Sequence, residues 1–253
     1  MLSPFIVVPT YREFENLPKF TERLWNSLPE ARLLLVDDAS DDGTPEWVRA
    51  HPRYDRQLFL LARAGKRGLG SAYLEGFAWV GRRMRAEPCL AVVQMDADLS
   101  HDPAVVKELL RAIEEGADLV LTTRYLDGVR VTNWPLRRLA LSRGAARYVR
   151  IITGMPFSDP TSGFKAFRPE KLAGLNLSQI RSDGYAFQIE VTHMAWRLGW
   201  KIREVPITFE DRSAGVSKMS ARIVREAVWR VPWMTLRRVR RSRLPVQNER
   251  FPL

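Results

Sequence analysis

The sequence predicts an α/β fold in which helices cover both faces of a mainly parallel sheet. In the first half of the chain, short apolar runs alternate with amphipathic segments, and this order is typical of parallel sheets. Two of these runs end in acidic residues, Asp37-Asp38 and Asp96-Ala97-Asp98, where strands of such sheets border a ligand site. The composition, with 45% hydrophobic and 27% charged residues among 253, is that of a globular protein.

The expected elements follow one another in a regular order. Apolar runs predict strands at residues 5–9, 33–36, 58–62, 89–95 and 119–123, and amphipathic segments predict helices at residues 17–28 and 71–84. Between them, Thr44 is expected to cap a helix over residues 45–50 that starts with Pro45. Asp102 caps a further helix, which Pro103 opens and Gly116 closes.

The second half of the chain is less regular. A strand is expected at residues 202–209 and a helix at residues 220–241, which Pro232 is expected to kink or break. Residues 128–150 contain six arginines and no acidic residue. Because no linker rich in Gly, Ser or Pro divides the chain, we expect one domain over residues 1–218 and an amphipathic, basic extension over residues 219–253.

Positive charge is concentrated toward the end of the chain. Residues 212–253 contain 11 Lys and Arg against two Asp and Glu, so they supply +9 of the net charge of +11. This asymmetry indicates an anionic partner, either nucleic acid or the cytoplasmic leaflet of a membrane. Cys89 is the only cysteine, which excludes an intrachain disulfide and a cysteine zinc cluster. Since neither a signal peptide nor an apolar run of about 18 residues is evident, we expect a cytoplasmic location.

Three polar segments carry candidate chemistry, and each has a simpler interpretation. Asp96 and Asp98 suit a divalent cation that bridges phosphates, or they cap a helix on a solvated loop. Residues 37–44 offer carboxylates to a nucleobase or ribose, or form an ordinary turn. The glycine-rich segment 65–70 precedes a helix and suits a phosphate, or is also a turn. It has neither the Walker spacing nor a GxGxxG, so an ATPase is not supported.

Several segments, taken in order, resemble the dolichol- and polyprenol-phosphate mannose synthases, which are family 2 glycosyltransferases of GT-A fold. They are residues 8–17, 36–44, 68–73, 95–101, 123–125, 134–138 with 142–144, 159–164, 184–190 and 211–218. The resemblance covers roughly residues 4–235. It implies a GT-A, Rossmann-like catalytic domain that binds a nucleotide diphosphate sugar.

The resemblance also implies roles for individual residues. Contacts to the nucleotide sugar are implied for Pro9, Tyr11, Glu13, Val36, Asp37, Asp38, Gly68, Asp96, Ala97, Arg212 and Lys218. Mg²⁺ or Mn²⁺ is implied at Asp96, Asp98 and Ser100, and the acceptor phosphate at Arg124, Arg138 and Ser142. Among these, Asp98, Arg124 and Arg138 are the implied catalytic residues. Ser100 stands where some members carry Gln, so a backbone oxygen or water is an alternative third metal ligand.

The implied reaction is metal-dependent, inverting transfer of mannose from GDP-mannose to polyprenyl (dolichyl) phosphate, giving a β-linked product. A phosphate monoester has a second pKa near ~6, so the acceptor is mostly a dianion at neutral pH and needs no general base. A membrane surface is the expected second partner. Trp229, Trp233, Phe251 and the arginine run in residues 237–243 suit an interfacial segment, attached peripherally to the cytoplasmic face.

Three other classes remain as alternatives. The first, of the same fold, transfers glucose or an aminosugar from a UDP-sugar to polyprenyl phosphate. The second binds nucleic acid through the basic tail, although no RNA-binding aromatic signature or zinc finger is present, and we expect no nucleic-acid partner. The third, a nucleotidyltransferase, also uses metal and carboxylates, but its glycine-rich N-terminal signature is absent.

Overall fold

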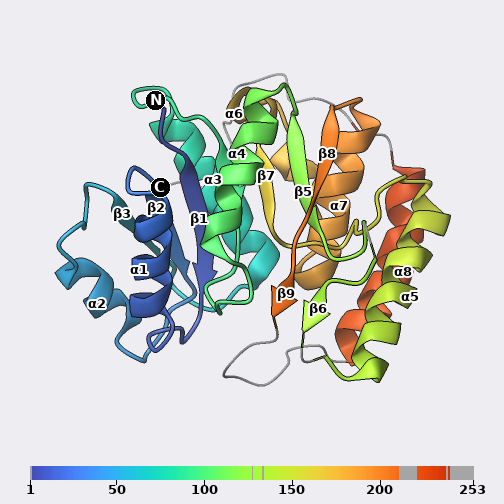
Figure 1. Cartoon of the computed structure of the whole chain (residues 1–253), viewed down its shortest axis with the longest axis horizontal. Coiled ribbons are helices and arrows are strands. Elements are labelled where there is room, and N and C mark those ends of the chain that lie inside the picture. Colours follow the sequence, from blue (N-terminus) through green and yellow to red (C-terminus); the bar gives the residue numbers. More distant parts are fainter. Residues whose placement is uncertain (1, 127, 133, 211–220, 238, 240–253) are drawn as a thin grey trace.

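Seven strands form one central sheet in the computed structural model, which describes residues 2–126, 128–132, 134–210, 221–237 and 239 (Figure 1). Their order is β3 (Leu58–Ala62), β2 (Arg32–Asp37), β1 (Phe5–Thr10), β4 (Val92–Gln94), β7 (Lys165–Phe167), β5 (Leu119–Thr123) and β8 (Ile202–Pro206). β7 runs antiparallel to both of its neighbours, and all other neighbours are parallel. The mixed, mainly parallel sheet predicted from the sequence is therefore confirmed.

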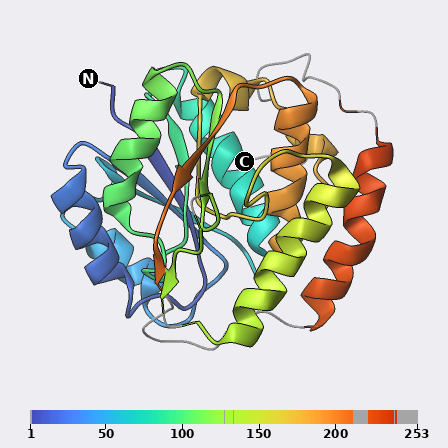
Figure 2. The ribbon, with the colours of Figure 1, turned by 45° about the vertical axis from the view of Figure 1, so that its right-hand side comes forward.

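Helices cover both faces of this sheet. One core cluster contains side chains of α1 (Leu17–Ser27), α2 (Thr44–Ala50) and α4 (Val106–Glu114), which follows the short helix η1 (Pro103–Val105). The other contains side chains of α3 (Leu69–Arg83), α6 (Pro169–Ala173), η2 (Leu177–Gln179) and α7 (Gly184–Arg197). Two long helices, α5 (Leu136–Thr153) and α8 (Ala221–Leu236), lie side by side beyond α7 (Figures 1 and 2). A small ribbon pairs β6 (Val131–Thr132) with β9 (Phe209–Glu210).

Strand β1 shows how the sequence specifies two buried faces. Phe5 and Val7 belong to the cluster under α3 and α7, whereas Ile6 and Val8 belong to the cluster under α1 and α4. All four side chains are fully buried. A strand that is buried on both faces is a continuous apolar run rather than an alternating one, and this is the pattern that predicted the strand.

Some element boundaries differ from the sequence prediction. The strand expected at residues 202–209 is interrupted, because β8 ends at Pro206 and β9 begins at Phe209. The expected strand 89–95 is regular only over Val92–Gln94. These three residues pair with three residues of β1 on one side and with the three residues of β7 on the other. The last expected helix, 220–241, ends at Leu236.

Helix α8 is not broken at Pro232, contrary to one expectation from the sequence. Proline has no N–H, so it cannot donate to the carbonyl four residues earlier, which belongs to Val228. The Tyr148 hydroxyl of α5 donates to that carbonyl instead, at 2.8 Å. Val231 and Met234 of α8 are buried in the core cluster that includes α7. The start of the predicted extension thus packs on the sheet domain, and the boundary at residue 218 lies outside the described residues.

The packing of α3 on the sheet predicts a stability effect at Gly76. A Cβ atom at Gly76 would lie 2.6 Å from Val7 Cγ1 and 3.1 Å from Val36 Cγ2, so helix and strand would have to separate. We expect Gly76→Ala to lower the free energy of unfolding by about 1–3 kcal/mol in urea titrations. Gly144, also within a helix, has no described atom within 4 Å of the equivalent position. Gly144→Ala should therefore stabilise by about 0.5–1 kcal/mol, and equal effects of the two changes would contradict this interpretation.

Candidate active site

The site is assembled where β1, β2 and β4 end, at one edge of the sheet. These strands are parallel neighbours, so the loops that follow them emerge together. Thr10 pairs with Asp37 in the register of β1 and β2, and Pro9 pairs with Val36, which is fully buried. The predicted nucleotide segments 8–17 and 36–44 are thereby adjacent, as are the acidic residues that follow β4.

Asp37 holds these loops together. Its carboxylate is fully buried and accepts hydrogen bonds from Thr10 Oγ1 at 2.9 Å, Ser40 Oγ at 2.6 Å and Ser40 N at 2.8 Å. A buried carboxylate with three donors is satisfied within the protein. The geometry gives Asp37 a role in shaping the turn, and its predicted contact with the nucleotide stays a prediction.

Asp38 belongs to a buried ionic network that the sequence did not reveal. The Arg63 guanidinium, with 1% of its side chain exposed, pairs with Asp38 Oδ1 and lies 3.3 Å from Glu75 of α3. Arg63 also donates to Ser71 Oγ at 2.6 Å, and the Gly68 amide donates to Asp38 Oδ2 at 3.1 Å. The predicted nucleotide residues Asp38 and Gly68 therefore contact each other, and Arg63 fixes the orientation of the carboxylate.

The glycine-rich turn is closed by a second carboxylate. Asp183 Oδ1 accepts hydrogen bonds from the amides of Gly70, at 2.6 Å, and Gly184, at 2.7 Å, so it caps both α3 and α7. Gly68 has φ +94°, and a Cβ there would lie 1.9 Å from Asp183 Oδ2. The turn requires glycine because of its backbone conformation and this close approach. Asp183 thus caps the start of α3, and the predicted contact of Gly68 with the nucleotide sugar stays a prediction.

Cations gather around Tyr11 on the loop after β1. Lys66 Nζ lies 3.6 Å from the centre of the Tyr11 ring, and Arg12 Cζ lies 5.4 Å from it. Arg12 forms an exposed bidentate pair with Asp41, which lowers the pKa of that carboxyl chiefly through the hydrogen bond. Glu13, also predicted at the nucleotide, accepts a hydrogen bond from Asn16 Nδ2 at 2.8 Å. Lys66 was not predicted, although it lies within the glycine-rich segment.

Two carboxylates of the predicted metal site are oriented by their neighbours. Tyr73 Oη donates to Asp96 Oδ1 at 3.3 Å, and burial followed by the charge of Asp96 raises the pKa of Tyr73. Asp98 Oδ1 accepts from Ser100 Oγ at 2.5 Å and from Ser100 N at 3.1 Å. Ser100 thus positions Asp98, and Ala97 between the two acids is buried.

Hard carboxylate oxygens at one turn suit Mg²⁺ or Mn²⁺. Within the described part of the chain, no three His, Cys, Asp or Glu residues form a metal cluster. A cation held by Asp96 and Asp98 would therefore draw further oxygens from water or from a bound diphosphate. This is consistent with a metal that binds together with its nucleotide.

His101 supports the same turn. Its Nδ1 accepts a hydrogen bond from the Asp96 amide at 3.0 Å, and its ring stacks on Phe164 with centroids 4.9 Å apart. The side chain is 4% exposed. His101 thus positions the backbone of Asp96.

Arg124, at the end of β5, is held by a buried carboxylate. Its Nε and Nη2 donate to Asp159 at 2.7 and 3.0 Å, and Nη2 lies 3.3 Å from Thr161 Oγ1. Asp159 is fully buried, and 11% of the Arg124 side chain is exposed. Burial disfavours the charge of Arg124, but the adjacent Asp159 outweighs it and raises the pKa of the guanidinium. Arg124 is therefore cationic and fixed in position.

The structure brings the three predicted acceptor residues together. Arg124 and Arg138 approach the same indole ring, Trp134, at 5.5 and 4.2 Å from Cζ to the ring centre. Ser142, one turn beyond Arg138 on α5, accepts a hydrogen bond from Tyr125 Oη at 2.7 Å. The two guanidinium groups therefore share one indole ring, and the Ser142 hydroxyl contacts Tyr125, the residue that follows Arg124. Arg212 and Lys218, the other predicted cations, lie outside the described residues.

A buried lysine near this site predicts a pH dependence of stability. Lys165 is fully buried, and its Nζ donates to the Gln188 carbonyl at 2.7 Å and to Gln188 Oε1 at 3.1 Å. Burial, partly offset by Asp159, lowers the pKa of Lys165 to about 7. An unfolded lysine keeps its proton up to a pH of about 10.4, so between these values the unfolded state binds more protons and stability rises with pH.

We therefore expect the free energy of unfolding of the wild-type protein, relative to Lys165→Met, to increase between pH 7 and pH 9. The measurement is a series of urea titrations at several pH values on both proteins. Parallel pH profiles would contradict a lowered pKa for Lys165.

The sheet order and the loops at its edge are those of a GT-A nucleotide-sugar glycosyltransferase. A family model, Glycosyl transferase family 2, matches residues 5–175. The chain belongs to glycosyltransferase family 2 and is a glycosyltransferase. This confirms the fold class and the enzyme class expected from the sequence motifs.

Curated relatives are similar over most of the chain. A polyprenol monophosphomannose synthase of Mycolicibacterium smegmatis is 44% identical over 94% of this chain and 89% of its own length. An undecaprenyl-phosphate mannosyltransferase of Micrococcus luteus is 43% identical over 88% of this chain and 89% of its own length. A dolichol-phosphate mannosyltransferase of Pyrococcus furiosus is 35% identical over 87% of this chain and 60% of its own length. The resemblance stated from the motifs is confirmed.

Among solved structures, glucosyl-3-phosphoglycerate synthase of Mycobacterium tuberculosis shares the fold. Its complex with UDP has a TM-score of 0.62 and 19% identity, over 92% of this chain and 80% of that one. A further complex of that enzyme, with the same TM-score and identity, contains Mn²⁺ and UDP and covers 93% of this chain and 79% of that one. In the part of the chain that the structure describes, no helix is both long and apolar enough to cross a bilayer.

Proposed function

We propose that this glycosyltransferase moves mannose from GDP-mannose to the phosphate of a polyprenyl lipid. The observation that carries the proposal is the grouping of Arg124, directly after β5, with Arg138 and Ser142 of α5 around Trp134 and Tyr125. A lipid phosphate is an anion that such a cluster can hold by charge-assisted hydrogen bonds. The names of the relatives at 43–44% identity, which act on polyprenol and undecaprenyl phosphates, support the same acceptor class.

The chemistry requires charge neutralisation more than proton transfer. The acceptor is mostly a dianion at neutral pH, because its second pKa is near ~6, so its oxygen attacks without a general base. Asp96 and Asp98 would hold Mg²⁺ or Mn²⁺, which supplies positive charge for the leaving diphosphate when bound. Arg124 and Arg138 offset the charge of the acceptor and direct its oxygen at the anomeric carbon. Attack in line with the leaving group inverts that carbon and yields a β-linked mannosyl phosphate.

The donor would lie across the ends of β1, β2 and β4. Tyr11, with Lys66 beside its ring, offers an aromatic face and a cation to the nucleotide. Asp38, which Arg63 and the Gly68 amide hold in place, is proposed to accept a further hydrogen bond from a base or ribose. Arg212 and Lys218 are proposed to close over the donor, as the motif in residues 211–218 implies.

The lipid acceptor resides in a bilayer, so the enzyme must contact the membrane surface, and helices α5 and α8 present a suitable surface. Their exposed apolar side chains include Leu136, Leu141, Ile151, Trp229, Trp233 and Leu236. Together with nearby arginines and the basic end of the chain, these suit peripheral attachment to an anionic cytoplasmic leaflet.

We expect Trp229→Ser, at a side chain 76% exposed, to weaken co-sedimentation with anionic vesicles severalfold without changing thermal stability. Unchanged sedimentation would exclude this face.

The test of the proposed function is a radiolabelled transfer assay with polyprenyl phosphate and either GDP-mannose or UDP-glucose. We expect a lipid-soluble product with GDP-mannose. An excess of unlabelled GDP should suppress its formation, whereas an excess of UDP should not. Product from UDP-glucose alone would instead establish the UDP-sugar alternative. No lipid product with either donor, under conditions where the protein is folded, would overturn the assignment.

A further inference from the structure

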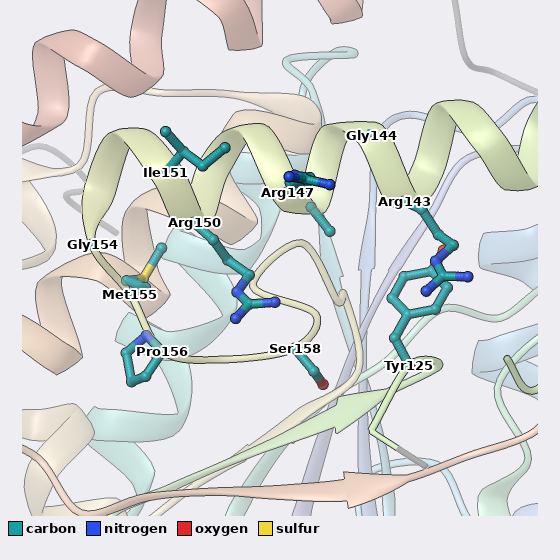
Figure 3. Close-up of a pocket in the computed structure, with 11 residues that line it drawn as sticks. Tyr125, Arg143, Gly144, Arg147, Arg150, Ile151, Gly154, Met155, Pro156 and Ser158 are labelled. Atoms are coloured by element: carbon teal, nitrogen blue, oxygen red, sulfur yellow. The ribbon is translucent and has the colours of Figure 1, made fainter. Parts of the chain in front are cut away.

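A pocket of about 900 Å³ lies beside the proposed acceptor residues, but Arg124, Arg138 and Ser142 do not line it. It is a hollow open to solvent between α5 and the segment of residues 154–158, with Tyr125 at one end. Figure 3 shows Arg143 and Arg150 extending from α5 toward Tyr125 and Ser158, while the Ile151 side chain points to the other side of the helix. The pocket therefore has a cationic wall on α5, and Met155 and Pro156 form an apolar lining at one end.

The cationic wall consists of three arginines on one face of α5. Arg143, Arg147 and Arg150 are spaced by four and three residues, which places them in one row. None of the pocket residues is acidic, and none of the three forms an ion pair with a carboxylate of the described residues. All three are exposed, and like charges at this spacing destabilise a helix, so a bound anion would offset their mutual repulsion.

The acid that bonds to the pocket floor is already satisfied. Glu204 Oε1 accepts hydrogen bonds from Ser158 N at 2.8 Å, from Ser158 Oγ at 2.7 Å and from Asp159 N at 3.3 Å. Glu204 does not line the pocket. Glu204 therefore holds the floor segment in place, and within the described residues it forms no ion pair with the three arginines.

Tyr125 lies between the pocket, which it lines, and the acceptor residues. Its hydroxyl donates to Ser142 at 2.7 Å, and its ring is approached by Arg124 Cζ at 5.3 Å and by Arg143 Cζ at 6.0 Å. Arg124 and Arg138 do not line the pocket. A ligand here would be a neighbour of the acceptor phosphate and not the acceptor itself.

We propose that this pocket binds the phosphate group of a second ligand, through Arg143, Arg147 and Arg150. Guanidinium groups bind phosphate oxygens with paired, charge-assisted hydrogen bonds. Met155 and Pro156 add apolar surface at one end of the pocket. An anionic phospholipid supplies both a phosphate and hydrocarbon, and free inorganic phosphate supplies only the first. The site would place an anionic headgroup next to the acceptor phosphate.

The experiment compares two double variants that remove the same charge. Arg147→Gln/Arg150→Gln alters the pocket, whereas Arg111→Gln/Arg137→Gln removes two exposed arginines outside it. Binding is measured by calorimetry to dihexanoyl phosphatidylglycerol below its micellar concentration, to the phosphatidylcholine analogue, and to inorganic phosphate. We expect the pocket variant to bind the phosphatidylglycerol at least about tenfold more weakly than the control variant, with no change for phosphatidylcholine. The same loss for inorganic phosphate would support the site with free phosphate as a ligand.

Equal losses in the two double variants would overturn the proposal, because general surface charge would then explain the binding. The proposal also fails if the pocket variant keeps its phospholipid affinity but has a raised KM for a short, soluble polyprenyl phosphate, since the pocket would then serve the acceptor. The calorimetric binding measurements contain no sugar donor, so they give a result even if the proposed mannosyl transfer is not observed.

Discussion

Asp98→Asn is expected to lower the rate of sugar transfer by about 10²–10³-fold. The amide keeps the size of the carboxylate and can still accept from Ser100, but it loses the negative charge that would hold a divalent cation. A leaving diphosphate without that cation is poorly stabilised, and losses of this order follow when such stabilisation is removed. The measurement is the initial transfer rate at saturating donor and acceptor, with the metal concentration varied.

Asp102→Asn provides the matched control for this change. Asp102 is an exposed acid four residues further on, and its carboxylate caps the next helix by accepting from the Ala104 amide at 3.0 Å. Asparagine caps helices as well as aspartate, so both stability and transfer should be retained. Full activity of the wild-type enzyme in excess EDTA, or equal activity of the two variants, would exclude a metal at Asp98.

The sequence predicted the first half of the fold well, because its strands are largely apolar and its helices begin at recognisable capping residues or prolines. The strand 58–62 and the strand 119–123 have the predicted bounds, because each starts with an apolar run after a polar residue and is followed by an arginine. Helix α5 was not predicted. Its buried face consists of Ser142, Ala146, Val149 and Thr153, which is too small and polar to form an apolar stripe. Strand β7 begins at a lysine, and a buried lysine in a strand has no sequence pattern that reveals it.

The candidate site was also predicted only in part. The motifs identified the segments that meet at the sheet edge, since strand ends and resemblance both point there. The partners that orient these residues were missed, because they come from distant parts of the chain. Arg63 binds Asp38, Asp183 binds Gly70, and Asp159 binds Arg124 across 35 residues. Such pairings depend on the order of strands in the sheet, which no single segment contains.

Arg124→Ala is expected to cost both stability and acceptor binding, and the two effects can be separated. Removing the guanidinium leaves the fully buried carboxylate of Asp159 without its counter-ion, a change that typically costs about 3–5 kcal/mol of folding free energy. Loss of transfer by this variant alone would not distinguish a damaged fold from a lost phosphate contact. A second variant that removes both charges is therefore needed.

In Arg124→Met/Asp159→Asn, neither buried charge is left unpaired, and the asparagine oxygen can still accept from Thr161 Oγ1, which lies 2.6 Å from Asp159 Oδ1. We expect urea titrations to show that the double variant recovers most of the lost stability. Its KM for polyprenyl phosphate should nevertheless stay about 10–150-fold above that of the wild type, since a charge-assisted contact is worth roughly 1.5–3 kcal/mol. The KM for the sugar nucleotide should change little. If acceptor affinity returned together with stability, Arg124 would hold the fold and not the acceptor phosphate.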